Sequence, residues 1–563
     1  MGTHRAARTF SWPPSRSRHP WLLVALAAAV AALVAGTLVV RPGPLAAAGS
    51  TRLWPFAEEP APACTPAQVR LVVDPQIIQP VQDILADRNG TRLPDGRCLR
   101  AEIESQASQD TLRDAATLPV TAAPDLWIPD SSLWPAQVAR GWTLRPRARL
   151  ALSPLVVASG KARIDRLGWT GDAPSWPQVV PAARPATVQG PASDTAGIHA
   201  LLGVWQLLGR GVEAERVVAA AVLAWKRAQR TTADTALRAA VAGARNAPLL
   251  LTDELTVART NRDEGRKALV GVRPRGPVPG LDYPVVEVAR PGGDAGRAVA
   301  VASVVTALTA PSARDVLRRF GLRDAPKGAA GQALAAALPS RATLSGFLGK
   351  LSLLETPTHL LTVIDVSTSM VAQVPGSPLN RIQLAGAAAV GAGDSLPDDA
   401  IIGLWAFAAR LDGRKPFKEL SPMAPLGSPD GGRTHREVLI GRLRSLGSLL
   451  SPNGTALYAT VRAAMRQARR DFDPTAVNSV VLFTDGRNER DRSVALDDLL
   501  AELRADTAAN PGRPVSLITI GIGPDADVAV LRKLAQATGG TSYRADRVEE
   551  MTAVIFDALA HRA

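Results

Sequence analysis

The sequence predicts an α/β protein with an N-terminal transmembrane helix and two folded α/β domains. Three observations lead to this prediction. The chain has 563 residues, which is more than a single hydrophobic core usually accommodates. Its hydrophobic fraction of 46% and charged fraction of 21% are ordinary for globular proteins. From about residue 63 onward, short apolar runs alternate with helical stretches, and this alternation is typical of α/β folds.

An uncharged apolar stretch occupies residues 21–40 and is long enough to cross a bilayer. Four arginines and no acidic residue precede it, so the positive-inside rule places residues 1–20 in the cytoplasm. Residues 41–62 are rich in Pro, Ala and Gly and are expected to form a spacer. A cleavable signal peptide is the open alternative, because small residues follow at 46–48. We expect a single-pass cell-membrane protein whose bulk is extracytoplasmic.

The chain has two cysteines, each of which comes just before an apolar run. Cys64 precedes Val69–Val73, and Cys98 precedes Leu99–Ile103, with a short helix expected over Ile77–Leu85 between them. Two parallel strands joined by a helix begin at the same edge of a sheet, so neighbouring strands would bring the two sulfurs within bonding reach. Outside the cytoplasm such a pair oxidises. We therefore predict a Cys64–Cys98 disulfide.

Residues 63–325 are predicted to form the first α/β domain. The order of their strands and helices resembles a bacterial extracellular solute-binding protein of the two-lobed, periplasmic-binding type. The resemblance implies a ligand cleft that is lined by loops at strand ends. The cleft residues that it suggests here are Asp130, Ser131, Ser132, Ser193, Asp194, Thr195 and Tyr283. Alternatively, these residues are helix caps and a packed aromatic side chain. The sequence does not identify a ligand.

An Ala- and Gly-rich linker that carries one helical stretch is expected over residues 326–355. Residues 356–563 then form a second α/β domain. Its predicted strands are continuous apolar runs, which are typical of a central, doubly wound parallel sheet that helices cover on both faces. The predicted strands are Leu360–Ile364, Ile401–Phe407, Val480–Phe483 and Val515–Ile520. The predicted helices are Ile382–Val390, Ala456–Ala468, Leu496–Arg504, Ala529–Ala537 and Val548–Ala560.

Oxygen-bearing side chains follow three segments of this second domain. Asp365, Ser367 and Ser369 come at the end of its first strand, Thr455 lies on a loop that enters a helix, and Asp485 ends another strand. Ligands of doubly wound sheets bind beyond the carboxyl ends of the strands. A set of hard oxygen donors without His or Cys suits Mg²⁺, Mn²⁺ or Ca²⁺. Simple turn formation by Asp and Ser is the alternative for the first three residues.

The same residues resemble the metal-ion-dependent adhesion site of the von Willebrand factor type A (vWA) domain. The family pattern is Asp-x-Ser-x-Ser, a distant Thr and Thr-Asp-Gly, which appear here as "DVSTS", "NGTAL" and "FTDG". Thr368 stands where Gly is common, and this departure leaves the ligand set unchanged. The resemblance implies that the hydroxyls coordinate the metal while the carboxylates hold water. A carboxylate of a protein partner would then fill the open position.

Charge and motifs narrow the classes of function. Of the net charge of +14, about +9 lies between residues 51 and 355, where it is scattered, and the region after residue 355 is neutral. An anionic envelope ligand therefore fits better than nucleic acid. Phosphate-binding loops, nucleophile elbows and zinc-protease motifs are missing from the sequence, so we do not expect an enzyme.

Two hypotheses about the function remain. One is an anchored adhesion or scaffold protein that binds a partner through the metal. The other is a solute-recognition component, importer-linked or sensory, whose vWA domain mediates assembly.

Overall fold

The computed structural model describes residues 64–545 apart from short gaps, which are 186–193, 229–232, 277, 279, 291–293, 327–337, 376, 414, 487, 490–492 and 525. The predicted transmembrane helix, its flanking tail and spacer, and the predicted helix Val548–Ala560 lie outside the described residues. Within the described part, no single helix is long and apolar enough to span a membrane. Helices α10 (Ala295–Thr309) and α11 (Pro311–Arg319) meet that criterion only together, and a bend of 55° separates them.

The first lobe of the N-terminal domain is built on a mixed five-stranded sheet. Its strand order is β2-β1-β3-β10-β4, in which β1 is parallel to β2 and β3 while β10 is antiparallel to both of its neighbours. The strands are β1 (Pro66–Val73), β2 (Cys98–Ser105), β3 (Leu126–Ile128), β4 (Thr143–Arg149) and β10 (Pro284–Ala289). Because Pro66 pairs with Cys98 in this register, Cys64 lies beside Cys98, and the predicted disulfide is present.

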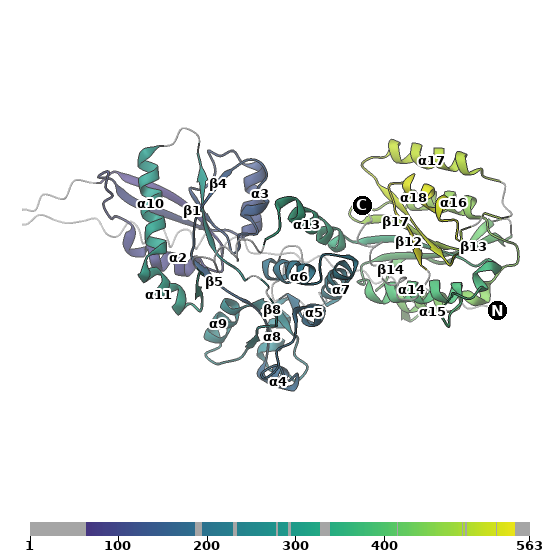
Figure 1. Cartoon of the computed structure of the whole chain (residues 1–563), viewed down its shortest axis with the longest axis horizontal. Helices are drawn as coiled ribbons and strands as arrows, with labels where there is room; N and C mark the ends of the chain where they lie inside the picture. Colours follow the sequence, from purple (N-terminus) through teal and green to yellow (C-terminus); the bar gives the residue numbers. More distant parts are fainter. Residues whose placement is uncertain are drawn as a thin grey trace, which may run out of the picture. The chain divides into compact units, whose positions relative to one another are not determined.

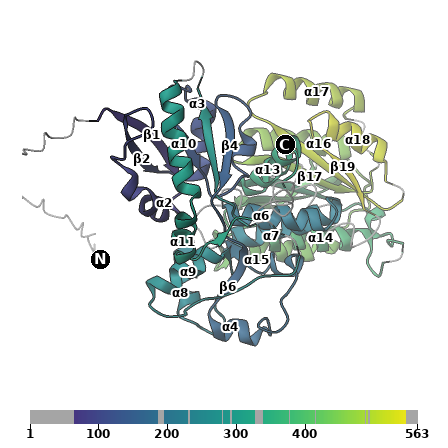
Figure 2. The same cartoon turned by 60° about the vertical axis from the view of Figure 1, so that its left-hand side comes forward.

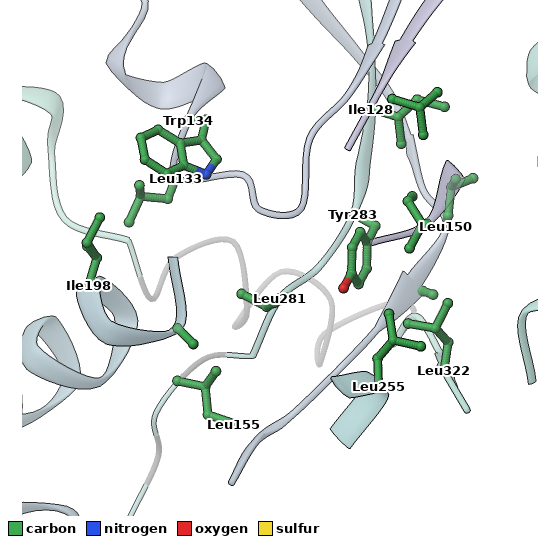
Figure 3. Close-up of a cluster of buried hydrophobic side chains, with 14 of the residues drawn as sticks. Ile128, Leu133, Trp134, Leu150, Leu155, Ile198, Leu255, Leu281, Tyr283 and Leu322 are labelled. Carbon is green, nitrogen blue, oxygen red and sulfur yellow. The ribbon is translucent and has the colours of Figure 1, made fainter. Parts of the chain in front are cut away.

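A second lobe contains a four-stranded sheet of order β7-β8-β6-β9. These strands are β6 (Leu155–Ser159), β7 (Arg184–Pro185), β8 (Leu250–Asp253) and β9 (Val270–Val272). The chain passes between the lobes twice, and the two passing segments pair with each other at Ser153 and Leu281. Gly280 permits this close approach, since an added Cβ there would lie 2.4 Å from the carbonyl oxygen of Ser153. Figure 3 shows the buried apolar side chains, among them Leu281 and Tyr283, that pack around this crossing.

Helices cover both sheets of the N-terminal domain. Helix α13 (Arg341–Glu355) also belongs to this core, because its residues Leu344 and Phe347 are buried in it and the Phe347 ring lies 5.1 Å from the Trp205 ring at a tilt of 38°. A two-stranded pair of β5 (Ala151–Leu152) and β11 (Arg323–Asp324) lies apart from the two main sheets. The remaining helices are α2 (Ile78–Leu85), α3 (Ser108–Thr117), α4 (Lys161–Arg166), α5 (Trp176–Val179), α6 (Thr195–Leu207), α7 (Val212–Ala228), α8 (Ala233–Val241) and α9 (Glu254–Asp263).

The C-terminal domain is a six-stranded sheet of order β14-β13-β12-β17-β18-β19. All neighbouring pairs are parallel except β13 and β14, so the sheet is mixed at one edge. The four central strands coincide with the predicted ones, whereas the two edge strands, β14 and β19, were not predicted because neither forms a continuous apolar run. The strands are β12 (Thr358–Asp365), β13 (Ile401–Asp412), β14 (Lys415–Pro425), β17 (Val477–Thr484), β18 (Val515–Ile522) and β19 (Ser542–Ala545). A short pair, β15 (Pro429–Asp430) and β16 (Arg433–Thr434), follows β14.

Two helical layers sandwich this sheet, as both views show: α14 and α15 cover one face, and α16, α17 and α18 cover the other (Figures 1 and 2). Strand β12 explains the arrangement. Leu360 and Ile364 point into the core under α14, whereas Leu361 and Val363 point into the core under α16. A strand buried on both faces reads as a continuous apolar run. The helices are α14 (Arg381–Ser395), α15 (His435–Arg444), α16 (Leu457–Arg470), α17 (Leu496–Ala509) and α18 (Val528–Gln536).

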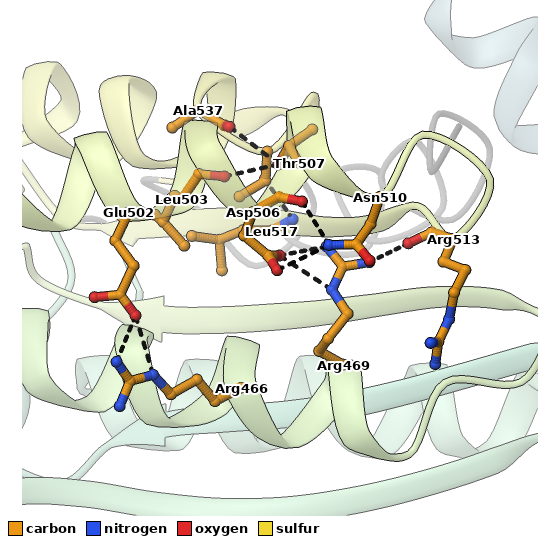
Figure 4. Close-up of polar contacts among 11 residues, drawn as sticks. Arg466, Arg469, Glu502, Leu503, Asp506, Thr507, Asn510, Arg513, Leu517 and Ala537 are labelled. Atoms are coloured by element: carbon orange, nitrogen blue, oxygen red, sulfur yellow. Dashed lines mark hydrogen bonds and ion pairs between the residues drawn. The ribbon is translucent and has the colours of Figure 1, made fainter.

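Ion pairs join the outer surfaces of α16 and α17 (Figure 4). Arg466 pairs with Glu502 at 2.7 Å, and Arg469 pairs with Asp506 one helical turn further along. Arg469 also donates to the backbone carbonyl of Arg513. These contacts are partly exposed, so each stabilises the fold by no more than about 1 kcal/mol. The apolar cores beneath them therefore determine the position of the helices.

Candidate functional site

Asp365 is the last residue of β12 and is completely buried. β12 lies between β13 and β17, where the strand order reverses, and Asp365 therefore lies at the carboxyl edge of the sheet beside this reversal. Its carboxylate accepts one hydrogen bond from the Ser367 backbone N–H at 2.8 Å and one from the Thr484 hydroxyl at 2.7 Å. Both contacts fix the carboxylate toward the loops beyond the sheet.

Ser369 lies on a short 3-10 turn, Thr368–Val371, and Ser367 is the residue directly before that turn. Their hydroxyl oxygens are 3.0 Å apart, so they converge on one point. A neighbouring loop holds this turn in place, because the Thr368 N–H and hydroxyl both donate to the Ser451 carbonyl, at 3.1 and 2.9 Å. Thr368 therefore supports the loop without being one of the predicted ligands.

Thr455 and Asp485 reach the same edge from two other segments. Thr455 lies on the loop that begins with Ser451 and enters α16. Its hydroxyl oxygen is buried and has no hydrogen-bond partner among the described residues. A buried hydroxyl without a partner is costly, and a bound cation would remove that cost. Asp485 follows β17, is 5% exposed, and accepts a hydrogen bond from Arg381 at 3.1 Å.

Burial and the nearby Asp485 carboxylate raise the pKa of Asp365 to about 7. The site thus combines two buried carboxylates that repel each other with a hydroxyl that lacks a partner. A divalent cation would relieve both conditions, so the residues present fit a hard cation. In the part of the chain that the structure describes, this site included, no group of three His, Cys, Asp or Glu side chains could hold a metal. A metal at this site would therefore depend on hydroxyls as well as carboxylates.

The rim of this site carries apolar and basic side chains. Among the described residues only four large apolar side chains are exposed, and two of them, Val371 and Leu450, belong to the site's own loops. Arg410 lies near the end of β13, next to Ala409, whose backbone N–H donates to the Gly454 carbonyl. Arg410 is exposed and has a positive φ of 57°. Backbone strain of this kind is concentrated at functional sites.

A cavity of about 170 Å³ lies between the two lobes of the N-terminal domain. It is lined by the ends of β1, β3 and β8 and by the first turns of α3, α6 and α9. The polar residues that line it are Asp74, Gln76, Ser108, Gln109, Asp130, Asp194, Thr195, Thr252, Asp253 and Thr256. The described lining contains no Lys, Arg or His, so the cavity is acidic although the domain carries a net positive charge.

Burial raises the pKa of three carboxyl groups that line this cavity. The pKa of Asp130 lies well above its usual value because of burial and the neighbouring Asp74, and the pKa values of Asp74 and Asp253 are raised by burial as well. Asp130 accepts from the Trp134 indole N–H at 2.8 Å, and Asp253 accepts from Ser153 at 2.6 Å. The carboxyl groups are therefore fixed in orientation.

The predicted cleft residues fall into two groups. Asp130, Asp194 and Thr195 line the cavity, although Asp194 also caps α6 by accepting from the Gly197 N–H. Ser131, Ser132 and Tyr283 do not line it and make internal contacts instead, with His199, Asp282 and Gln76 respectively. Ser193 lies outside the described residues. Asp74 and Asp253 also line the cavity, although they were not predicted from the sequence. Each directly follows or ends an apolar run, the same signal that singled out Asp365.

Ser131 and His199 form a buried hydrogen-bonded pair at 2.7 Å. Burial lowers the pKa of His199 to about 4, so its ring is neutral at neutral pH. Its second ring nitrogen is buried without a partner in the described structure, and Ser131 is only 1% exposed. The pair has neither an orienting acid nor access to a substrate, so we interpret it as part of the core.

The fold and the two sites define a protein that joins a two-lobed binding domain to a vWA domain. The family model of bacterial extracellular solute-binding proteins matches residues 69–323. The von Willebrand factor type A domain model matches residues 359–557. Both resemblances drawn from the sequence are confirmed. Members of the first family are extracellular, which favours an extracytoplasmic location, and both domain types are typically binding modules.

Several known proteins are similar to this chain or to part of it. The chain is 23% identical over 509 residues to "Uncharacterized protein Rv1836c" of Mycobacterium tuberculosis, covering 84% of this chain and 73% of that protein. Among solved structures, a von Willebrand factor type A protein from Catenulispora acidiphila is 23% identical with a TM-score of 0.27, covering 37% of this chain and only 43% of the other. The sulfate-binding protein SubI of M. tuberculosis is 16% identical with a TM-score of 0.32, covering 49% and 92%.

Proposed function

We propose that this protein is a membrane-anchored, extracytoplasmic binding protein that engages a protein partner through a divalent cation in its vWA domain. The observation that carries the proposal is the convergence of Asp365, Ser367 and Ser369 on one sheet edge together with the buried, unpartnered hydroxyl of Thr455. When bound, Mg²⁺, Mn²⁺ or Ca²⁺ would supply a Lewis-acidic position that a partner's carboxylate can occupy.

The chain's own residues have separate roles in this proposal. The serine and threonine hydroxyls would coordinate the cation directly, and Asp365 and Asp485 would supply the negative charge around it. Few anionic ligands leave the cation electrophilic, so it attracts a carboxylate from outside. Val371 and Leu450 would contact apolar side chains beside that carboxylate, which favours a protein partner over a small anion.

Titration of Mg²⁺ or Mn²⁺ into the purified full chain, followed by calorimetry, tests the metal site. Wild type should bind, and Asp365→Asn and Thr455→Val should bind at least about tenfold more weakly. Asp473→Asn is the matched control, because Asp473 lies on the exposed loop before β17, at the opposite edge of the sheet. The assignment is wrong if wild type shows no heat of binding and no thermal shift up to millimolar cation.

Partner binding requires a second experiment. Immobilised full chain should capture a protein from cell-envelope extract in Mg²⁺ and release it in EDTA, and the Asp365→Asn protein should not capture it. Capture that EDTA leaves unchanged would contradict a metal-dependent interaction.

Solute recognition is the second candidate function, and the cavity between the lobes favours it. Its acidic, hydroxyl- and amide-bearing walls fit a cationic or hydroxyl-rich solute better than an oxyanion. In this case the vWA domain would mediate assembly with an importer or a sensor. Native mass spectrometry of the purified chain should then detect a bound small molecule, and Asp130→Leu should abolish the adduct while leaving the Mg²⁺ response unchanged.

A further inference from the structure

Arg381 is a buried cation beside the candidate metal site. It is the first residue of α14, directly after the capping residue Asn380, and its backbone N–H donates to the Ala372 carbonyl at 3.0 Å. Its side chain is only 7% exposed, which is unusual for arginine. The sequence motif gives no sign of this residue, since Arg381 is 104 positions from its partner Asp485.

The guanidinium lies between the Asp485 carboxylate and the backbone at Gly523. One of its amino groups is 3.1 Å from Asp485 Oδ2. On the other side, an added Cβ at Gly523 would lie 2.8 Å from Arg381 Nε, and Gly523 has a φ of +87°. A side chain at position 523 would displace the guanidinium. The loop after β18 thus leaves space for this cation at the site.

Arg381 changes the charge that a metal ion would meet. The buried charged groups described at this edge are Asp365, Asp485 and Arg381. With the arginine in place, a divalent ion binds next to a fixed positive charge, and Asp485 shares its charge between two cations. Like charges at short distance in a poorly solvated site repel strongly. Arginine side chains carry a permanent positive charge in proteins, so this repulsion persists.

We propose that Arg381 is a built-in counter-cation that weakens divalent-ion binding to the site without a partner. The proposal rests on the metal site proposed above. Without metal, Arg381 compensates the charge of Asp485. The ion is then held firmly only when a partner adds a carboxylate, so metal binding and partner binding become coupled.

A structural ion pair is the competing explanation, and the two differ in the sign of one effect. If Arg381 only stabilises the fold, replacing it should leave metal affinity unchanged or weaker. If it opposes the metal, neutral replacements should bind metal more tightly even though they lose a buried ion pair. The informative variants are Arg381→Gln and Arg381→Met, which remove the charge, and Arg381→Lys, which keeps it.

Calorimetric titration of Mg²⁺ into the full chain at pH 7.5 provides the test, with a Mg²⁺-dependent thermal shift as the second readout. We expect the Mg²⁺ affinity of Arg381→Gln and Arg381→Met to be at least about tenfold higher than that of wild type. Arg381→Lys should have the same affinity as wild type. Arg436→Gln is the control. Arg436 forms a comparable ion pair with Asp398, with 2.8 Å between the charged atoms, and this pair lies away from the site.

The outcomes separate this inference from the metal site itself. Neutral variants that bind Mg²⁺ as wild type does, or more weakly, overturn the role of Arg381 and leave the metal site standing. Loss of folding in both neutral variants assigns Arg381 a structural role only and also overturns it. If neither wild type nor any Arg381 variant responds to Mg²⁺, then the metal site is wrong, and the role of Arg381 is wrong with it.

Discussion

Replacing Asp365 by Asn should stabilise the metal-free vWA domain and abolish its response to Mg²⁺. Asn has the size of Asp and can still accept the hydrogen bond from the Ser367 N–H, but it carries no charge. The substitution therefore removes a buried negative charge while preserving the shape of the turn. A residue that served only as a turn cap would give the opposite result, since loss of a capping side chain costs about 0.5–2 kcal/mol.

The magnitude follows from the pKa of Asp365. Burial and the nearby Asp485 raise it from 3.8 to about 7 in the folded domain. Below pH 4 the group is protonated in both the folded and the unfolded state, and it has no effect on the free energy of unfolding. Between about pH 4 and pH 7 the unfolded chain ionises first, so the folded domain loses stability as pH rises. At about 1.4 kcal/mol per pKa unit the loss reaches about 4 kcal/mol.

Hydrogen exchange of the full chain, followed by mass spectrometry, measures this effect within the vWA domain. The informative peptides cover β12 and β17, whose amides exchange only when the sheet opens. In EDTA, wild-type protection should fall between pH 5 and pH 8 after correction for intrinsic exchange, and Asp365→Asn should show little pH dependence. Mg²⁺ should restore protection in wild type by mass action and leave the variant unchanged.

Two results would refute this reasoning. One is an Asp365→Asn protein that is less protected than wild type at pH 8 in EDTA, which would make the carboxylate a net stabilising group. The other is a variant that still gains protection from Mg²⁺. Asp473→Asn again provides the control, because its carboxylate lies on an exposed loop and should affect neither measurement.

Three further predictions concern other parts of the molecule. Cys64→Ser should lower the free energy of unfolding of the N-terminal domain by about 3–4 kcal/mol, because the disulfide to Cys98 closes a loop with a sequence separation of 34; dithiothreitol should reproduce the loss in denaturant unfolding of wild type but not of the variant. Val371→Ser and Leu450→Ser together should weaken Mg²⁺-dependent partner capture without changing Mg²⁺ affinity. The control is Leu118→Ser, at an exposed leucine of the other domain, which should change neither partner capture nor Mg²⁺ affinity. If the double variant captures as much partner as wild type, the rim is excluded from the interface. Protease added to intact cells should digest the chain beyond its N-terminal apolar segment, and complete protection would contradict the proposed topology.

Local sequence patterns were sufficient for much of the fold. The central strands of the vWA domain are continuous apolar runs because they are buried on both faces, and this pattern requires no knowledge of the tertiary structure. The Cys64–Cys98 disulfide followed from the expected parallel pairing of two strands, which the structure confirms. The edge strands β14 and β19 were missed because neither contains a continuous apolar run that would reveal it.

The candidate metal site shows the same division. The sequence by itself determined the oxygen donors Asp365, Ser367 and Ser369, since they follow one strand at fixed spacing. Only the tertiary structure places Arg381 against Asp485 and leaves the Thr455 hydroxyl without a partner. The acidic character of the cavity between the lobes was likewise decided by packing, which brings together carboxylates that lie far apart in the chain. Spacing along a chain determines which side chains share a strand end, but the charge and solvation of a site depend on every segment that folds against it.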